Sequence, residues 1–370
     1  MRLAAFNVEN LFDRAKIMQL DEWAEGKAIL EAYGRLVDLI EQRTYSAVTK
    51  SKIVALLDQL GLARDDTGKY VRLRQNKGRL LKRPRNGPIE IVADGWDDWL
   101  GSVELIDAPI DADATRNTAQ VIRDVDADVL AVIEAEGRTQ LKDFSDQLLP
   151  AIGGQAYRHV MLIDGNDRRG IDVGLLTRDG FEIGPMFSHV DDEPDNHGDG
   201  IFSRDCPEFC VTTPSGKKLW VLVNHLKSKG YGKAADNDRR RKAQATRIAS
   251  IYASLRERGE GRVAVVGDLN DTPDSDPLAP LMATDLKDVS TLPVYEDDGR
   301  PGTYKNGAKG QKIDYILVSP ALARNATKAG VFRKGVWGGT HGDMWPIYPE
   351  MTTEAKAASD HAAIWCDFDV

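Results

Sequence analysis

The sequence predicts an α/β fold, because short apolar strands with polar ends alternate with helical stretches. Leu219–Val223 and Val263–Val266 are predicted strands, and residues 238–256 between them are predicted to form a long helix. The first strand runs into His225 and the second into Asp268. Strands and helices that alternate with few long gaps are typical of α/β proteins.

The other predicted elements repeat this pattern in chain order. Residues 118–124 are a predicted helix, and the further strands with their polar ends are Leu3–Phe6 with Asn7 and Glu9, Asp128–Ile133 with Glu134, Val173–Leu176 after Arg169 and Asp172, Ile316–Val318 after Asp314, and Ala362–Trp365 after Asp360 and His361. Carboxylate, amide and imidazole groups at a strand end must be solvated, paired or bound to an ion. We interpret them as two walls of one metal-assisted phosphoester site.

Seven segments carry a family resemblance: FNVENLF, DVLAVIEAE, RGIDVGLL, LVNHLKSKG, VVGDLNDTPDSDPL, KIDYILVS and SDHAAI. In this order they resemble the endonuclease/exonuclease/phosphatase superfamily, the fold of pancreatic deoxyribonuclease and the apurinic-site endonucleases. The resemblance covers residues 1–12 and about 115–370. It implies a four-layer α/β/β/α sandwich of two mixed sheets.

Compared with the family, the chain carries a large insertion after the first strand, at residues 14–110 of a single domain spanning 1–370. Apolar residues at helical spacing predict a helical part over 21–60, and a basic strand-like part follows over 69–92. Its residues 69–85 hold eight Lys or Arg and no acid. Two interpretations weigh equally: a contact to backbone phosphates, or a solvated hairpin paired with Asp94, Asp97 and Asp98.

The amino-acid composition limits which partners and which compartment are expected for this protein. Lys plus Arg number 49 against 58 Asp plus Glu, a net charge of −9, which argues against nonspecific coating of nucleic acid but not against a nuclease. The three cysteines favour a reducing compartment, and Cys206 and Cys210 fit buried thiols better than half a zinc site. Without an evident leader or apolar span, we expect a cytoplasmic protein with no stable membrane association. No protein partner can be inferred.

A carboxylate at the end of an apolar strand calls for a cation, and Glu134 is such a group. The resemblance makes Glu134 the main Mg²⁺ or Mn²⁺ ligand, with Asn7 beside it and Glu9 and Asp360 completing the site. Mg²⁺ suits a sparse set of oxygen ligands better than zinc or calcium does. Taken alone, Asn7 also fits a turn-forming cap.

Asp268 and Asn270 lie two apart, so in an extended segment their side chains point the same way. The resemblance implies that Asp268 activates or orients the attacking water and that Asn270 holds this aspartate or a phosphate oxygen; an Asx turn is the alternative. It also implies that Asp314 orients His361, since Asp360 should point away from its neighbour in a strand. His361 then either activates water or binds phosphate as imidazolium.

The remaining candidates surround this centre. By resemblance His225 contacts the phosphate or protonates the leaving oxygen and Asn224 adds a donor, although His225 also fits a strand cap. Arg169 and Asp172 are expected at the rim. Lys227 opens a cationic stretch that runs to Arg241. Three loop residues, Trp337, His341 and Trp345, are expected to overhang the site and contact substrate, or the indoles simply pack on the insertion.

The leading hypothesis is a divalent-metal-dependent phosphodiesterase, a nuclease that cleaves nucleic acid by in-line attack of water. The alternative directs the same machinery at a small phosphoester such as a nucleotide, an inositol phosphate or a phospholipid headgroup. A catalytically silent binding module is a third reading, and the complete set of catalytic residue types argues against it.

Overall fold

The computed structural model describes residues 1–9, 11–19, 23–167, 169–193, 200–230 and 233–370. The chain divides into two units, of which the first comprises Met1–Phe12 with Ile110–Val370 and the second comprises Asp13–Pro109. This division falls within one residue of the predicted insertion, 14–110. That the two units make one domain stays a prediction.

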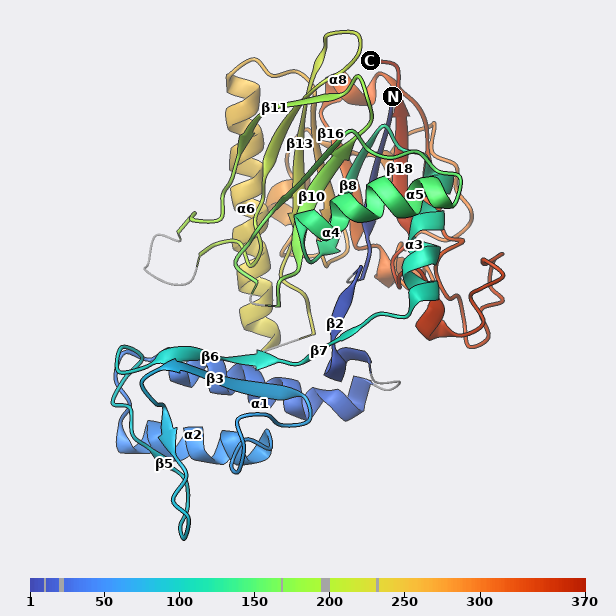
Figure 1. The fold of residues 1–370 in the computed structure, drawn as a ribbon. Coiled ribbons are helices and arrows are strands. Elements are labelled where there is room, and N and C mark those ends of the chain that lie inside the picture. Colours follow the sequence, from blue (N-terminus) through green and yellow to red (C-terminus); the bar gives the residue numbers. More distant parts are fainter. Residues whose placement is uncertain (10, 20–22, 168, 194–199, 231–232) are drawn as a thin grey trace. The chain divides into compact units, whose positions relative to one another are not determined.

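A six-stranded mixed sheet forms one layer of the first unit (Figure 1). Its order is β17 (Ala326–Phe332), β18 (Ala363–Phe368), β1 (Arg2–Asn7), β8 (Val129–Ala135), β10 (Asp172–Thr177) and β9 (His159–Ile163). Strand β1 runs parallel to β8 and antiparallel to β18. The two ends of the chain therefore meet in the middle of this sheet.

A second six-stranded mixed sheet packs against the first. Its order is β11 (Glu182–Phe187), β12 (Glu208–Thr212), β13 (Lys218–His225), β14 (Val263–Asp268), β16 (Asp314–Val318) and β15 (Lys287–Asp288). Strands β13 and β14 are parallel, whereas β14 and β16 are antiparallel. The apolar residues that face each other across the two sheets form the central core, for example Leu3 and Ala5 of β1 with Val221 and Val223 of β13.

Helices cover the outer face of each sheet. Successive residues of a strand point to opposite faces, so each strand contributes both to the central core and to an outer core beneath the helices. In β1, Leu3 and Ala5 point to the central core, whereas Ala4 and Phe6 pack with helix α3. Helices α3 (Ala112–Val125), α4 (Arg138–Asp143) and α5 (Leu149–Ala151) cover the first sheet, while α6 (Ala234–Glu257) and α7 (Ala279–Met282) cover the second. Four layers result, which confirms the predicted α/β/β/α sandwich.

Short helical turns complete the first unit: α8 (Pro320–Ala323), a π-helical turn at Phe144–Leu148 and 3-10 turns at Val289–Thr291, Lys309–Gln311 and Glu354–Lys356. Within the described part of the chain, no helix has both the length and the apolar composition needed to cross a bilayer. Cys206, Cys210 and Cys366 are buried free thiols.

The second unit has a hydrophobic core of its own, in which Leu36 of one helix packs with Leu57 of another and with Leu73 of a strand. Its elements are β2 (Asp13–Ala15), a 3-10 turn (Lys16–Gln19), α1 (Trp23–Ile40), α2 (Ala47–Gln59), β3 (Val71–Lys77), β4 (Leu81–Lys82), β5 (Glu90–Ile91), β6 (Leu100–Leu105) and β7 (Asp107–Pro109). The strands pair as β2 with β7, β3 with β6 and β4 with β5. Residues 21 and 22, at the predicted start of the helical part, lie outside the described residues.

Candidate active site

Three site residues of the second sheet stand in one row across neighbouring strands. His225 of β13 is the register partner of Asp268 of β14, and Asp268 is in turn the partner of Asp314 of β16. All three side chains are buried. The backbone ladder thus places an imidazole and two carboxylates side by side at one end of the sheet.

Gly267 permits the close approach of β13 and β14 at this row. Its φ is +119°, and a Cβ there would lie 2.1 Å from the carbonyl oxygen of Asn224 on the neighbouring strand. Any other residue would meet both backbone strain and a backbone clash. The glycine before Asp268 is therefore required by the site's geometry.

The first sheet positions its residues through irregular backbone. Ile133 and Ala135 of β8 pair with Val173 and Asp172 of β10, so Glu134 between them is the extra residue of a β-bulge, with φ of +67°. Glu9, after β1, also has positive φ, at 51°, as does Asn270 after β14 of the second sheet, at 55°. Such conformations cost about 1–3 kcal/mol each for a non-glycine residue, and they concentrate at functional sites.

One oxygen, Oδ2 of Asp268, gathers groups from both sheets. The amides of Asn7 and Asn270 each donate to it from 3.2 Å, and Nε2 of His225 and of His361 lie 3.7 and 3.9 Å away. The other carboxylate oxygen accepts from the Asn270 backbone at 2.8 Å. Burial and the charge of Asp314 raise the pKa of Asp268 to about 7. Asp268 is the geometric centre of the cluster.

Asp314 holds His361 in one orientation. Its carboxylate lies 3.0–3.1 Å from Nδ1 of His361 and accepts from the Thr303 hydroxyl at 2.6 Å. Burial alone would lower the pKa of His361, but the charge and hydrogen bond of Asp314 outweigh it and raise the pKa well above its usual value. Because Nδ1 donates to Asp314, Nε2 is left facing Asp268.

Asp360 and Glu9 border the same cluster. The backbone amide of Asp360 donates to the Glu9 carboxylate at 2.8 Å, and the amide of Glu9 donates to Oδ1 of Asn7 at 3.0 Å. Oδ1 of Asp360 also lies 3.6 Å from Nε2 of His361, so the two side chains do not point in opposite directions as expected. The expectation was wrong because β18 begins only at Ala363, so these residues do not alternate as in a strand.

His225 is the neutral partner of Glu134. Its Nε2 lies 3.5 Å from Oε1 of Glu134. Burial, reinforced by the charges of Arg204 and Arg169, holds the pKa of His225 well below its usual value. The side-chain amide of neighbouring Asn224 donates back to the carbonyl of Leu222, and its buried Oδ1 has no hydrogen-bond partner among the described residues.

A cationic group lies beside His225. Arg169 forms two hydrogen bonds to Asp167, and the buried Arg204 also contacts Asp167, at 3.0 Å. Burial, with the charges of Arg204 and Arg169, lowers the pKa of Lys227 to about 8. Asp172 accepts from the Gly165 amide at 2.8 Å, and burial raises the pKa of Asp172 to about 6. These residues surround the row without joining it.

Two residues of α6 brace the loops that carry the site. Arg241, fully buried, pairs with Asp271, the residue after Asn270, and donates to the carbonyl of Lys227, two residues after His225. Gln244 accepts from the Lys227 amide and donates to the carbonyl of Ile201. Arg241 ends the cationic stretch that was considered for phosphate attraction, but its buried guanidinium pairs with Asp271 and with the carbonyl of Lys227 instead.

The loop with the two indoles is anchored to the protein itself. Trp345 donates to the carbonyl of Val336 at 2.9 Å, and the guanidiniums of Arg300 and Arg333 lie 5.3 and 5.6 Å from its ring centre. Trp337 packs on the outer core of the first sheet, and His341 is exposed. Among the described residues, no hydrogen bond joins these three candidates to Asp268.

Three residues near the cluster, Thr303, Tyr304 and Arg204, were not predicted from the sequence. The Tyr304 ring centre lies 4.8 Å from that of His361. Thr303 is eleven residues from Asp314 in a turn-rich segment, and no local pattern marks it. Only Arg204 could have been noticed from the sequence, because it is a cation in a short segment flanked by the apolar residues Phe202 and Cys206.

Oxygen donors suited to a divalent cation are present. Asn7 offers an amide oxygen, and the 19%-exposed Glu134 carboxylate makes no ion pair with Lys or Arg among the described residues. It lies 3.5 Å from the neutral His225, and the buried Arg204 acts on it through its charge without pairing with it. A carboxylate without a paired cation fits a hard metal ion. Asp268, Asp314 and His361 also come within 4.8 Å of one another. In that group Asp314 already accepts from Thr303 and contacts His361.

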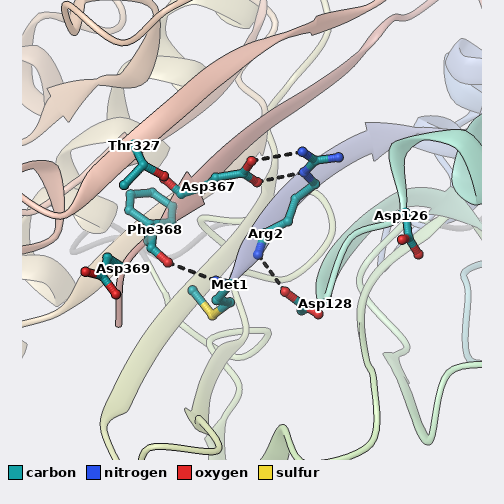
Figure 2. Close-up of a pocket in the computed structure, with 8 residues that line it drawn as sticks. All are labelled: Met1, Arg2, Asp126, Asp128, Thr327, Asp367, Phe368 and Asp369. Atoms are coloured by element: carbon teal, nitrogen blue, oxygen red, sulfur yellow. Dashed lines mark hydrogen bonds and ion pairs between the residues drawn. The ribbon is translucent and has the colours of Figure 1, made fainter.

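A separate pocket of about 550 Å³ opens at the other end of the first sheet (Figure 2). Arg2 fills one side of it, pairing with Asp367 at 2.7 Å and donating its backbone amide to Asp128 at 2.7 Å. The terminal amine of Met1 donates to the carbonyl of Phe368. Because β1 starts here and ends at Asn7, this pocket is not part of the Asp268 cluster.

The chain is similar to a known family and to several solved structures. Residues 106–361 match the model of the Endonuclease/Exonuclease/phosphatase family. A search of curated proteins found no match. Among solved structures, a mannosyl-6-phosphatase from Bacteroides thetaiotaomicron is 19% identical with a TM-score of 0.50, over 70% of this chain and 92% of that one.

Two further solved structures are similar. The human Nocturnin catalytic domain with bound sulfate is 15% identical with a TM-score of 0.49, over 70% of this chain and 87% of its own. Truncated TDP2 from Caenorhabditis elegans is 18% identical with a TM-score of 0.48, over 69% and 90%. The family model spans more than half of the chain, and its range contains Glu134, Asp268 and His361. This chain belongs to the Endonuclease/Exonuclease/phosphatase family, whose members are hydrolases of phosphoester bonds.

Proposed function

We propose that this protein is a Mg²⁺- or Mn²⁺-dependent phosphodiesterase that hydrolyses nucleic-acid phosphodiester bonds by in-line attack of water. The carrying observation is the convergence on Oδ2 of Asp268, where two amides and two imidazoles from both sheets meet within 3.9 Å. Such a set contains a proton acceptor and donors for phosphate oxygens in one place. The cationic group of Arg169, Arg204 and Lys227 supports an anionic substrate.

In this mechanism Asp268 accepts the proton of the attacking water at Oδ2, and Asn7 and Asn270 keep that oxygen aimed at the site. His361, held by Asp314, donates from Nε2 to a phosphate oxygen. A divalent cation held by Glu134 and Asn7, with Glu9 and Asp360 nearby, would supply positive charge to the phosphate in the transition state. The neutral His225 stands at the leaving-group side, with Asn224 as an additional donor.

The outer candidates keep the roles predicted from the sequence. Arg169, Asp172 and Lys227 bind substrate at the rim, and Trp337, His341 and Trp345 contact it from their loop. The cytoplasmic location also stays a prediction.

The same cluster suits a smaller phosphoester, and this is the second candidate. It is favoured by the named activity of one similar structure, a mannosyl-6-phosphatase. The donors of the Asp268 row suit a diester within a polymer and a monoester alike, because both present non-bridging phosphate oxygens to them. The substrate therefore has to be identified by turnover.

A substrate panel tests the proposal. Labelled plasmid, single-stranded DNA, RNA, a sugar phosphate and bis-p-nitrophenyl phosphate are incubated with Mg²⁺, Mn²⁺ or chelator, using the parent, Asp268→Ala and the exposed-site control Asp276→Ala. We expect the parent and Asp276→Ala to cleave the nucleic acids when metal is present, and Asp268→Ala not to cleave them. Turnover restricted to the sugar phosphate would replace the nuclease assignment by the second candidate. Cleavage that survives both chelator and Asp268→Ala would reject the mechanism, and binding without turnover would indicate a silent module.

A further inference from the structure

Residues 69–85 of the second unit carry eight cationic side chains and no acid. Sequence analysis left two interpretations of this run, a phosphate contact or a hairpin neutralised by Asp94, Asp97 and Asp98. The contacts within this unit separate them, because each interpretation requires different partners for the cations.

The acids proposed as partners are engaged elsewhere or unused. Asp94 pairs with Lys50 of α2 at 2.6 Å, and Asp98 accepts from the Asp94 backbone at 2.6 Å. Within the run, Arg74 pairs with Glu104 and Arg83 with Asp66. No ion pair in the described chain joins the run to Asp94, Asp97 or Asp98, which removes the neutralised hairpin.

Four cations of the run remain exposed and, among the described residues, have no recorded acidic partner: Lys77, Arg79, Lys82 and Arg85. We call them the basic segment. Their neighbours fix their orientation, since Leu80 and Leu81 are buried in the core of this unit while Arg79 and Lys82 on either side face solvent. Arg85 lies in the loop between β4 and β5, a hairpin that projects from the rest of the unit (Figure 1).

We propose that the second unit binds the phosphate backbone of nucleic acid through the basic segment. This inference deepens the proposed function and rests on it for the choice of polyanion. Clustered cations without carboxylate partners release counterions when phosphates replace them, which drives nucleic-acid binding. Among the described residues of this unit the exposed large apolar side chains are Val48, Trp96 and Leu100, all outside residues 77–85 in sequence, although Leu100 is the register partner of Lys77. A single apolar side chain beside four cations gives a bilayer little apolar area to bury, and vesicles are therefore one arm of the test.

The test compares two variants of the full chain with equal charge. The segment variant is Lys77→Gln, Arg79→Gln, Lys82→Gln and Arg85→Gln. The control is Lys27→Gln, Arg35→Gln, Arg43→Gln and Lys52→Gln, four exposed cations of the same unit. Each removes two Lys and two Arg, so only the location differs. Circular dichroism checks that both fold.

Binding of a labelled single-stranded oligonucleotide is measured by fluorescence anisotropy over a KCl series, with chelator present so that nothing is cleaved. We expect the segment variant to bind at least roughly tenfold more weakly and its log K against log[salt] slope to fall by about 3, since each lost phosphate contact removes ~0.7. The control should keep the parent's slope.

Three results would overturn the inference: parent-like binding by the segment variant, an equal loss in the control, or a loss confined to anionic phosphatidylserine vesicles. Hydrolysis of bis-p-nitrophenyl phosphate reports the Asp268 site separately and should be unchanged in both variants. If the parent cleaves no nucleic acid while the segment variant loses binding, the proposed nuclease activity fails and this inference stands. If the parent cleaves nucleic acid and the segment variant binds it as tightly as the parent does, the proposed function stands and this inference fails.

Discussion

The two sheets build their halves of the candidate site in different ways. In the second sheet, His225, Asp268 and Asp314 are direct register partners at the ends of regular strands. In the first sheet, Glu134 is a bulged residue with positive φ, and Glu9, two residues after Asn7, also has positive φ. One wall is a product of ordinary pairing and the other a product of local strain.

This difference separates two physical sources of precision. A backbone ladder fixes relative side-chain positions through many hydrogen bonds, so the row of the second sheet has positive φ only beside it, at Gly267 before Asp268 and at Asn270 after it. A bulge re-aims one side chain at a cost of about 1–3 kcal/mol, which the surrounding fold must offset. We infer that the regular wall supplies the proton acceptor and the strained wall supplies the cation site.

The largest expected effect distinguishes these two tasks. Asp268→Asn should lower kcat/KM by roughly 10³-fold at every Mg²⁺ concentration, because proton acceptance is lost. Glu134→Gln should instead raise the Mg²⁺ concentration for half-maximal activity by at least roughly 10- to 100-fold, the range that even outer partners of a metal ligand cost. Metal titration of bis-p-nitrophenyl phosphate hydrolysis measures both.

Asp276→Asn removes an exposed carboxylate from the same loop region and is the control. If excess Mg²⁺ restores Asp268→Asn but not Glu134→Gln, the assignment of the two walls is reversed.

A cross-wall contact gives the next effect. Asp314 of the second sheet orients His361, which precedes β18 of the first, so Asp314→Asn and His361→Gln should each lower kcat roughly 10²-fold. Because the pair acts as one unit, the double variant should lose little more than His361→Gln alone. Additive losses would show that Asp314 and His361 contribute independently.

The regular wall depends on one glycine, which a stability measurement tests. Gly267→Ala should lower the free energy of unfolding by at least about 2 kcal/mol, from strain at positive φ together with the clash on Asn224. Gly216→Ala is matched, because Gly216 has φ of +77° with nothing within 4 Å, and should cost only about 1 kcal/mol. Urea unfolding measures the free energy of unfolding of both variants. Equal losses would mean that β13 and β14 can move apart around a Cβ at position 267 without a loss of stability.

The smallest effect concerns a histidine–carboxylate pair outside both walls. Burial lowers the pKa of His189, but the hydrogen bond to Glu208 and the charge of Asp192 outweigh it, so the folded pKa is raised. The pair's stabilisation is therefore complete below about pH 6.5 and is lost as pH rises through the folded pKa, by on the order of 1 kcal/mol.

His189→Gln should flatten the dependence of unfolding free energy on pH in this window without changing hydrolysis. A loss of turnover in this variant would extend the functional cluster to the edge of the second sheet.

Much of the fold followed from local pattern. The predicted helix 238–256 lies inside α6, and the predicted strands that carry Asn7, Glu134 and Asp268 are β1, β8 and β14. The edge strands β9, β11, β15 and β17 and the inner strand β12 were not predicted. Edge strands are partly exposed and carry less apolar pattern, as in β11, whose residues are mostly exposed.

What the sequence determined by itself is the set of chemical groups and the strand ends on which they stand, because both follow from short-range periodicity and residue type. Tertiary structure alone decided their convergence on one oxygen of Asp268, the bulge that aims Glu134, the hydroxyl of Thr303 behind Asp314 and the burial of Arg241 beneath two loops. These depend on contacts between residues that lie 11 to 261 positions apart in the sequence. Such contacts form only when two sheets and a helix pack together, and no local stretch of sequence encodes them.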